Sequence, residues 1–318
     1  MINKQSIFQC VQRLALISLI VLCTVPTYAQ RRGGYYGASA GDNYHFGYIS
    51  GTVGYSMLQT NLSSVLPRGN FGGAVGAGYE FRNSGFWASV GVQLSFHRSS
   101  LIIDEYVYDH RGLDTQGRST TFHYRVNQVD EVNWNFFDVP IIFGYYVKGF
   151  HIGGGLKVSY ALNPQTYTKG MYNLSATNDN LSVTFENMPD RGYTDYRFGY
   201  THENRLNVGV SGIGEIGYDV LSKARVRSSM CHVMRFSFYF EYGLNNYLKN
   251  WDAAEQRVVP DDYGDAPKAT IYPYLNTFTN PARTVPFYTG LKITYMIGGT
   301  PGKTSTSREG GCMCYQNN

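Results

Sequence analysis

Six ionisable side chains stand in segments whose residues alternate between apolar and polar types. Three are acids and three are cations, so their formal charges cancel. They are Glu80, Lys157, Glu215, Arg235, Glu241 and Lys292. Facing one enclosed space, such a set could form ion pairs, or it could line a selective channel or a proton path. Because a selective pore usually carries charges of one sign, the balance favours a salt-bridged plug.

The histidines offer little for catalysis. His97 and His151 are in phase with the six charges, but neither has an obvious acid partner in the sequence. Three others, His110, His123 and His202, stand near Asp109, Asp114 and Glu203. The sequence contains no nucleophile motif, phosphate-binding glycine loop or zinc-ligand spacing. We therefore predict no enzymatic activity, no catalytic residue and no bound metal or cofactor.

The segments that carry these residues are predicted to be membrane-crossing strands. In the clearest one, residues 86–97, Val90 lies on an apolar face and Gln93 on a polar face. A strand that crosses a bilayer at a tilt needs about 9–11 residues. The eight predicted strands are residues 48–58, 71–81, 86–97, 134–146, 150–162, 205–220, 233–245 and 285–297.

Composition agrees with an all-β, antiparallel transmembrane barrel. Charged residues make up 16% of the chain and aromatic residues 15%, whereas ordinary soluble domains carry about 25% charged residues. The mean hydropathy is still only −0.28, as expected when alternate residues alone face lipid. A soluble β-sandwich is the alternative, but aromatic residues recur at both ends of the apolar faces, where lipid headgroups would lie. The formal charge of +4 gives no reason to expect nucleic acid as a partner.

Connections of alternating length predict short periplasmic turns and long extracellular loops. Residues 101–108 and 119–129 alternate weakly. They either extend the third and fourth strands or add a hairpin, which would give ten strands in place of eight. Pro140 lies inside the fourth strand, and we interpret it as a β-bulge beside a lumen-facing Asp138.

The ends of the chain predict targeting and export. An apolar run over residues 14–23 and the small-x-small site before Gln30 indicate a signal peptide at 1–29. A linker at 30–43, the barrel at 44–298 and a polar periplasmic tail at 299–318 complete the predicted organisation. Cys231, Cys312 and Cys314 would all lie in the oxidising periplasm, so we predict a disulfide from Cys231 to one of the other two.

The predicted outer loops are rich in tyrosine. They include Tyr106, Tyr108, Tyr167, Tyr172, Tyr193 and Tyr196. Tyrosine-rich loops supply large contact areas for protein recognition at a low entropic cost. Equally, these side chains could pack the loops over the barrel mouth, and the sequence leaves both interpretations open.

The segment 137–143, Phe-Asp-Val-Pro-Ile-Ile-Phe, resembles the signature of the PorT-like outer-membrane β-barrel family. Residues 153–156, 212–218 and 242–246 are similar to later strands of that family, in the same order. Gly144 departs from the lysine that many relatives carry, and the outer loops are longer. The resemblance implies a non-enzymatic accessory or scaffold component of type IX-like protein secretion in the outer membrane of a Gram-negative bacterium.

Two other functions fit the same pattern. One is a small passive pore, and the other is a surface binding module that acts through the outer loops. The expected partners are outer-membrane lipid and other envelope proteins that contact those loops.

Overall fold

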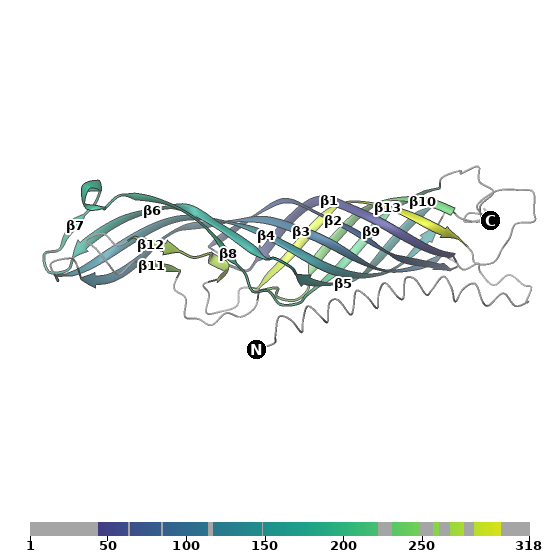
Figure 1. Cartoon of the computed structure of the whole chain (residues 1–318), viewed down its shortest axis with the longest axis horizontal. Coiled ribbons are helices and arrows are strands. Elements are labelled where there is room, and N and C mark those ends of the chain that lie inside the picture. The colour runs from purple at the N-terminus through teal and green to yellow at the C-terminus, as the bar shows by residue number, and fades with distance from the viewer. Residues whose placement is uncertain are drawn as a thin grey trace, which may run out of the picture.

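The computed structural model describes residues 44–62, 64–83, 85–113, 117–147, 149–221, 231–248, 257–260, 268–276 and 283–299. Eight antiparallel strands form a closed ring in the order β1-β2-β3-β4-β5-β9-β10-β13, and β13 pairs with β1. The ring strands are β1 (Tyr44–Thr60), β2 (Val65–Asn83), β3 (Phe86–Leu113), β4 (Ser119–Val147), β5 (Phe150–Ala161), β9 (Gly209–Leu221), β10 (Cys231–Gly243) and β13 (Thr284–Gly299). The predicted eight-stranded barrel is confirmed (Figure 1).

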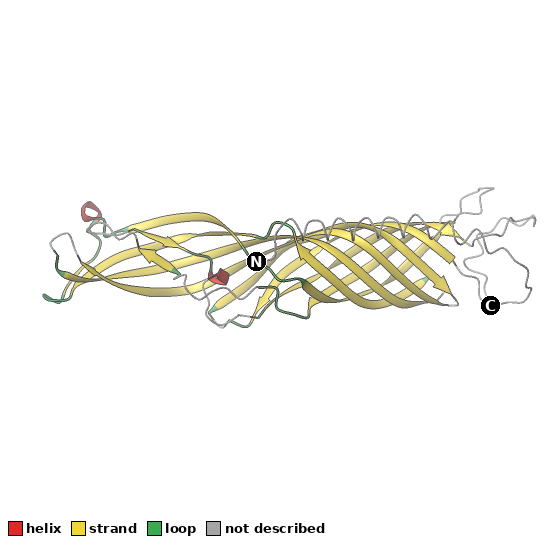
Figure 2. Ribbon diagram, turned by 60° about the horizontal axis from the view of Figure 1, so that its bottom comes forward, coloured by secondary structure: helices red, strands yellow, loops and turns green. Residues whose placement is uncertain are grey.

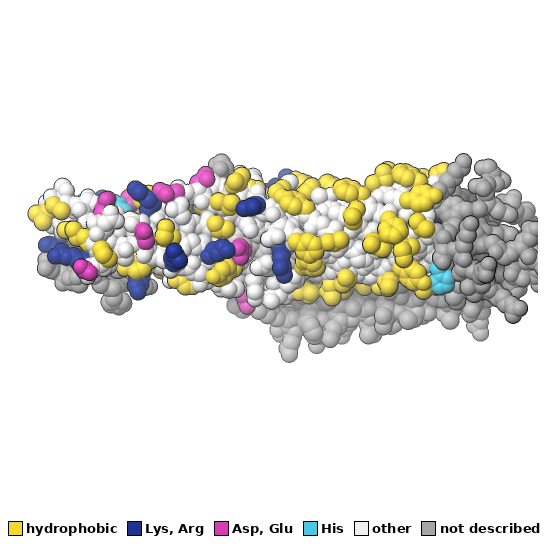
Figure 3. All heavy atoms as spheres, turned by 90° about the horizontal axis from the view of Figure 1, so that it is seen from above, with side chains coloured by type: hydrophobic (Ala, Val, Ile, Leu, Met, Phe, Trp, Pro, Cys, Tyr) yellow, Lys and Arg dark blue, Asp and Glu magenta, His cyan; other side chains and the backbone are white. Residues whose placement is uncertain are grey.

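The outward face of the ring is apolar along the predicted phase. Val90 of β3 is 44% exposed, and Leu291 of β13 is 63% exposed. On the face seen in Figure 3, hydrophobic side chains gather over the barrel half of the molecule and charged side chains over the other half. No helix in the part of the chain that the structure describes is long and apolar enough to cross a membrane.

Strands β3 and β4 continue far beyond the barrel as a second sheet. β3 alone has 28 residues, which extend for about 90 Å, against a bilayer core of about 30 Å. β6 (Gln165–Asn178) pairs with the outer part of β4, and β8 (Asp195–Glu203) and β7 (Val183–Phe185) pair with β6. We call the outer parts of β3 and β4 together with β6, β7 and β8 the extension (Figures 1 and 2).

The predicted connections between the barrel strands are long, but much of this region is sheet rather than loop. The weakly alternating segments extend β3 and β4 and do not form additional barrel strands. Between β5 and β9 the chain forms β6, β7, β8 and the short 3₁₀ helix η1 (Pro189–Arg191). β6 was missed because both of its faces carry polar residues, so it lacks the apolar face of a lipid-exposed strand.

A strap between β10 and β13 covers the inner face of the extension. It contains β11 (Val258–Pro260), β12 (Ala269–Ile271) and the 3₁₀ helix η2 (Tyr274–Asn276). Val258 and Ile271 are fully buried against Tyr124, Leu174 and neighbouring residues of the sheet. η2 packs over the barrel mouth in a cluster with Trp134 and Phe136.

Five of the six tyrosines lie in the core of the extension or pack against it, as the packing interpretation expects. Tyr172 and Tyr193 belong to the buried core of the extension, and Tyr106, Tyr108 and Tyr196 pack against it partly buried. Only Tyr167 among the six stands on the outward face, at 37% exposure.

Two local predictions need correction. Pro140 pairs in continuous register with Lys157 of β5 and forms no bulge. On the side of β3, the pairing is interrupted between Val90 and Gln93, but the register does not shift there. The bulges lie elsewhere, at residues 69–73 of β2 and 103–106 of β3. The sixth predicted strand, residues 205–220, begins too early, because Leu206 precedes β9 and packs against the cluster at the barrel mouth.

Several predictions fall outside the described residues. The signal peptide, the linker and residues 300–318 of the tail are among them, as are the side chains of the three cysteines in the predicted disulfide.

Candidate functional site: the barrel interior and the outer sheet

The six predicted charges all lie inside the barrel, but in two separate networks. The first network is near the short turns and centres on Arg235, which is 2% exposed. Its guanidinium donates to Glu80 at 2.8 and 3.0 Å and to Asp219 at 2.8 and 3.3 Å. Glu215 accepts from Arg235 at 3.4 Å and from Lys292 at 2.7 Å.

The second network lies nearer the barrel mouth and centres on Lys157. Its ammonium nitrogen is 2.5 Å from Glu241 and 3.2 Å from Asp138. Gln93 and Ser95 also donate to Asp138. A buried apolar layer that includes Trp87, Ile142 and Ile213 lies within the same barrel interior.

The sequence analysis missed two members of the first network. Arg82 donates to Glu80 at 2.6 Å and forms an ion pair with Asp219 at 2.8 Å. The predicted second strand ends at residue 81 and leaves Arg82 outside it, whereas β2 continues to Asn83. Asp219 lies four residues after Glu215 in β9, so strand alternation alone would have placed it inside.

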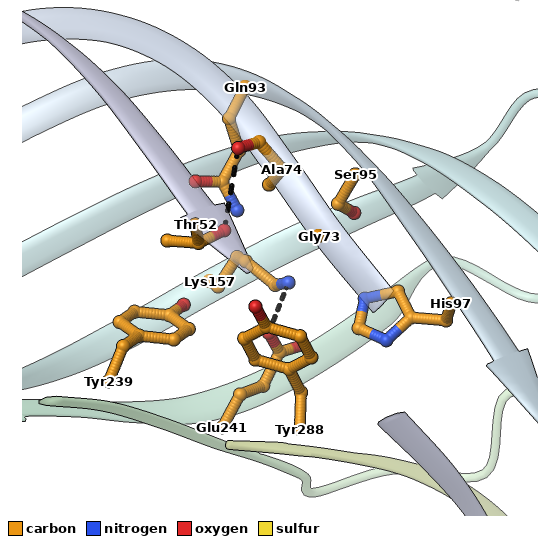
Figure 4. Close-up of a pocket in the computed structure, with 10 residues that line it drawn as sticks. All are labelled: Thr52, Gly73, Ala74, Gln93, Ser95, His97, Lys157, Tyr239, Glu241 and Tyr288. Atoms are coloured by element: carbon orange, nitrogen blue, oxygen red, sulfur yellow. Dashed lines mark hydrogen bonds and ion pairs between the residues drawn. The ribbon is translucent and has the colours of Figure 1, made fainter. Parts of the chain in front are cut away.

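Side chains fill the barrel almost completely. The space between Lys157, Glu241, His97, Tyr239 and their neighbours measures about 10 Å³ (Figure 4). A single water molecule needs about 10–15 Å³. Because the charges are paired and the space between them is this small, the interior has the structure of a plug.

One arrangement in the first network has the order of a serine hydrolase triad. His151 Nε2 lies 3.1 Å from Ser237 Oγ, and His151 Nδ1 lies 3.4 Å from Asp219 Oδ1. His151 is 0% exposed and Ser237 is 3% exposed. Asp219 is also held by two arginines. A substrate could not reach this hydroxyl, so we assign the three residues to the plug.

A cluster of buried hydrogen bonds around Asp130, which we call the polar knot, connects the strap to the sheet beyond the lipid-facing belt. Asp130 is fully buried and accepts hydrogen bonds from the Tyr274 backbone N–H at 2.6 Å, Gln128 at 2.8 Å and Thr168 at 2.9 Å. Gln128 also donates to the Tyr272 carbonyl at 3.0 Å. Burial raises the pKa of Asp130 above its usual value.

The outward face of the extension is polar, and its charges form cross-strand pairs. Lys169 lies 2.5 Å from Glu131, and Arg125 lies 3.5 Å from Glu105. His123, one of the histidines considered for catalysis, bonds Asp109 at 2.7 Å. Within the described ranges, no group of three or more His, Cys, Asp or Glu side chains could hold a metal ion.

Comparisons with known proteins place the chain in a family. Among similar solved structures is the attachment invasion locus protein Ail of Yersinia pestis, in complex with the heparin analogue sucrose octasulfate. It shares 9% identity over 80% of this chain and 98% of that chain, with a TM-score of 0.25. No curated protein matches. The family model described as outer membrane protein beta-barrel domain matches residues 29–249. The narrower PorT-like resemblance stays a prediction. The chain therefore belongs to the outer membrane protein beta-barrel domain family and is an outer-membrane protein.

Proposed function

We propose that this protein is a sealed, non-enzymatic barrel that holds a rigid sheet above the outer membrane as a surface for binding other macromolecules. The observation that carries the proposal is the continuity of β3 and β4, with 28 and 29 residues, from the packed barrel into the packed extension. Because the same strands form both parts, the extension is fixed to the membrane without a hinge of loop residues.

The outward face of the extension is the surface that the proposal assigns to binding. Met171 is 39% exposed on β6 and lies beside Arg197 of β8 and Asn127 of β4. Tyr167 lies four residues before Met171 on the same face of β6. Gly199 of β8 has no side chain, which leaves room for the Tyr167 ring. Isolated apolar and aromatic side chains among amides and charges are typical of recognition surfaces.

Site-specific photocrosslinking in intact cells tests this assignment. A photoreactive residue at Met171 should crosslink to a macromolecule, and the crosslink should be lost when Tyr167→Ser and Arg197→Ser are added. The matched control carries the photoreactive residue at Leu291, which faces lipid on β13. Equal protein crosslinks from both positions, or none from Met171, would contradict the proposal.

Assistance to type IX-like secretion, which the PorT-like resemblance implies, is the second candidate. The motif gives it limited support here, because Asp138 of that motif bonds Lys157, Gln93 and Ser95 inside the plug. Loss of secreted proteins from the medium after deletion of the gene would favour it.

A passive pore is disfavoured by the filled interior, and a reproducible conductance in planar bilayers would restore it.

A further inference from the structure

The outer rim of the lipid-facing belt carries two arginines on adjacent strands. Along β3 the outward residues run through Leu94 and Phe96 to Arg98, and Arg98 is exposed. On β2, Arg68 is exposed and pairs in register with Ser100, two residues beyond Arg98. Diagonal neighbours of this kind lie about 7–8 Å apart, so both guanidinium groups can reach one ligand.

An aromatic pair marks the headgroup level directly beneath these arginines. The rings of Phe71 and Phe96 have centroids 5.7 Å apart on the same two strands. The Arg98 guanidinium carbon lies 6.0 Å from the centroid of the Phe96 ring. Aromatic side chains gather at the membrane interface, and arginines whose stems pack there keep their charged ends among the headgroups.

The acidic neighbours leave this sector positive. Glu131 is opposite Ser100 on β4, but its carboxylate bonds Lys169 at 2.5 Å. Asp104 lies farther out on β3, within the 103–106 bulge, and its backbone N–H bonds the Ser64 carbonyl. Asn70, Asn133 and Asn135 are exposed, uncharged polar residues around the pair.

On the opposite rim, the outward polar side chains that the structure describes include His45 and His232, which bond the phenols of Tyr79 and Tyr295. Arg82, at the same level, points into the barrel. Basic side chains thus flank the lipid-facing belt on the side of the extension.

We propose that Arg68 and Arg98 together bind the phosphate of a lipid headgroup in the outer leaflet. Planar guanidinium groups donate paired hydrogen bonds to phosphate oxygens. The position continues the lipid-facing surface of β2 and β3, so a lipid whose acyl chains lie against Val75 and Leu94 presents its phosphate here.

Native mass spectrometry of the full-length protein in a neutral detergent tests this site. The probes are phosphatidic acid, the matching diacylglycerol, which lacks the phosphate, and inorganic phosphate. The wild type should retain phosphatidic acid, and the Arg68→Gln/Arg98→Gln double variant should retain it roughly tenfold less, as two charge-assisted interactions are lost. Arg191→Gln, which removes an exposed arginine from η1, should bind as the wild type does.

Three results would overturn the proposal. One is undiminished phosphatidic acid binding by the double variant, with folding verified by its heat-dependent mobility on gels. Another is an equal loss in Arg191→Gln, which would indicate attraction by net charge. The third is retention of diacylglycerol or displacement of the lipid by equimolar inorganic phosphate, since neither fits a lipid phosphate site.

Discussion

The two halves of β4 share one buried face but meet different surroundings on the other. Its even-numbered residues are buried from Thr120 to Gly144. Its odd-numbered residues face outward and change character between Asn135 and Phe137. Up to Asn135 they are polar except for Val129, and from Phe137 onward they are apolar.

The buried face changes in the opposite direction. In the extension it carries Phe122, Tyr124 and Val126, which pack under the strap. In the barrel it carries Asp138, which pairs with Lys157. The surroundings of the outward face, lipid or water, therefore determine which residues that face carries. The interior is filled by apolar side chains that pack together or by charged side chains that form pairs.

Removing Arg235 should have the largest effect. Arg235→Met leaves Glu80 and Asp219 without their main partner, and breaking a buried ion pair costs about 3–5 kcal/mol. The loss should appear as a lower unfolding temperature in detergent, measured by gel mobility. Arg118→Met, at an exposed position of the extension, is the control. Equal shifts in the two variants would indicate a watery interior.

Arginine scanning along the outward face of β3 should locate the membrane boundary. Val90→Arg places a charge in lipid and should destabilise the barrel by about 2–4 kcal/mol if the position is near the midplane. Val107→Arg makes the same change on the extension, where the side chain is 56% exposed to water, and should be tolerated. Gln93→Arg, facing Asp138 in the interior, should also be milder. Similar damage at Val90 and Val107 would place the boundary elsewhere.

The change from lipid to water along the outward face explains which elements could be predicted from the sequence. All eight barrel strands were predictable because lipid imposes a largely apolar face on each of them. The sheet of the extension was not, because water accepts many residue types on the outward face of β6. The charged interior was predictable by phase, Asp219 included, apart from Arg82, which follows the predicted end of the second strand. The separation of those charges into two networks was not, because it depends on which strands the closed ring brings opposite one another.

Breaking the polar knot should loosen the extension and spare the barrel. Asp130→Ala removes the acceptor of the Tyr274 N–H and of Gln128 and Thr168, and unsatisfied buried donors cost about 1–3 kcal/mol. Near-ultraviolet circular dichroism should show earlier melting of the tyrosine signal than of the β-sheet signal. Simultaneous loss of both signals at the wild-type temperature would show that Asp130 is dispensable.

The same carboxyl group should make the extension sensitive to pH. Burial raises the pKa of Asp130, so the folded extension holds this proton more tightly than the unfolded chain does. The stability that depends on this group is therefore complete below the ordinary pKa of 3.8 and is lost as the pH rises through the raised value. Asp130→Asn, which does not titrate, should flatten this part of the pH profile of the melting temperature. A wild-type extension that becomes more stable over this range would reverse the sign and show that the hydrogen bonds to the carboxylate outweigh its burial.

The smallest effect is expected from an ion pair that matches one in the barrel interior. Lys169 and Glu131 on the extension are 2.5 Å apart, as are Lys157 and Glu241 in the interior. The side chains of the first pair are 47% and 40% exposed, whereas those of the second are 1% and 2% exposed. Water and salt screen the exposed pair, and removing its lysine leaves a carboxylate that water solvates. Lys169→Met should therefore leave the unfolding temperature unchanged within error, and Lys157→Met should lower it. A double-mutant cycle with Glu131→Gln and Glu241→Gln isolates each coupling energy. If the exposed pair couples as strongly as the interior pair, the distance between charges, rather than their exposure to water, controls stability in this protein.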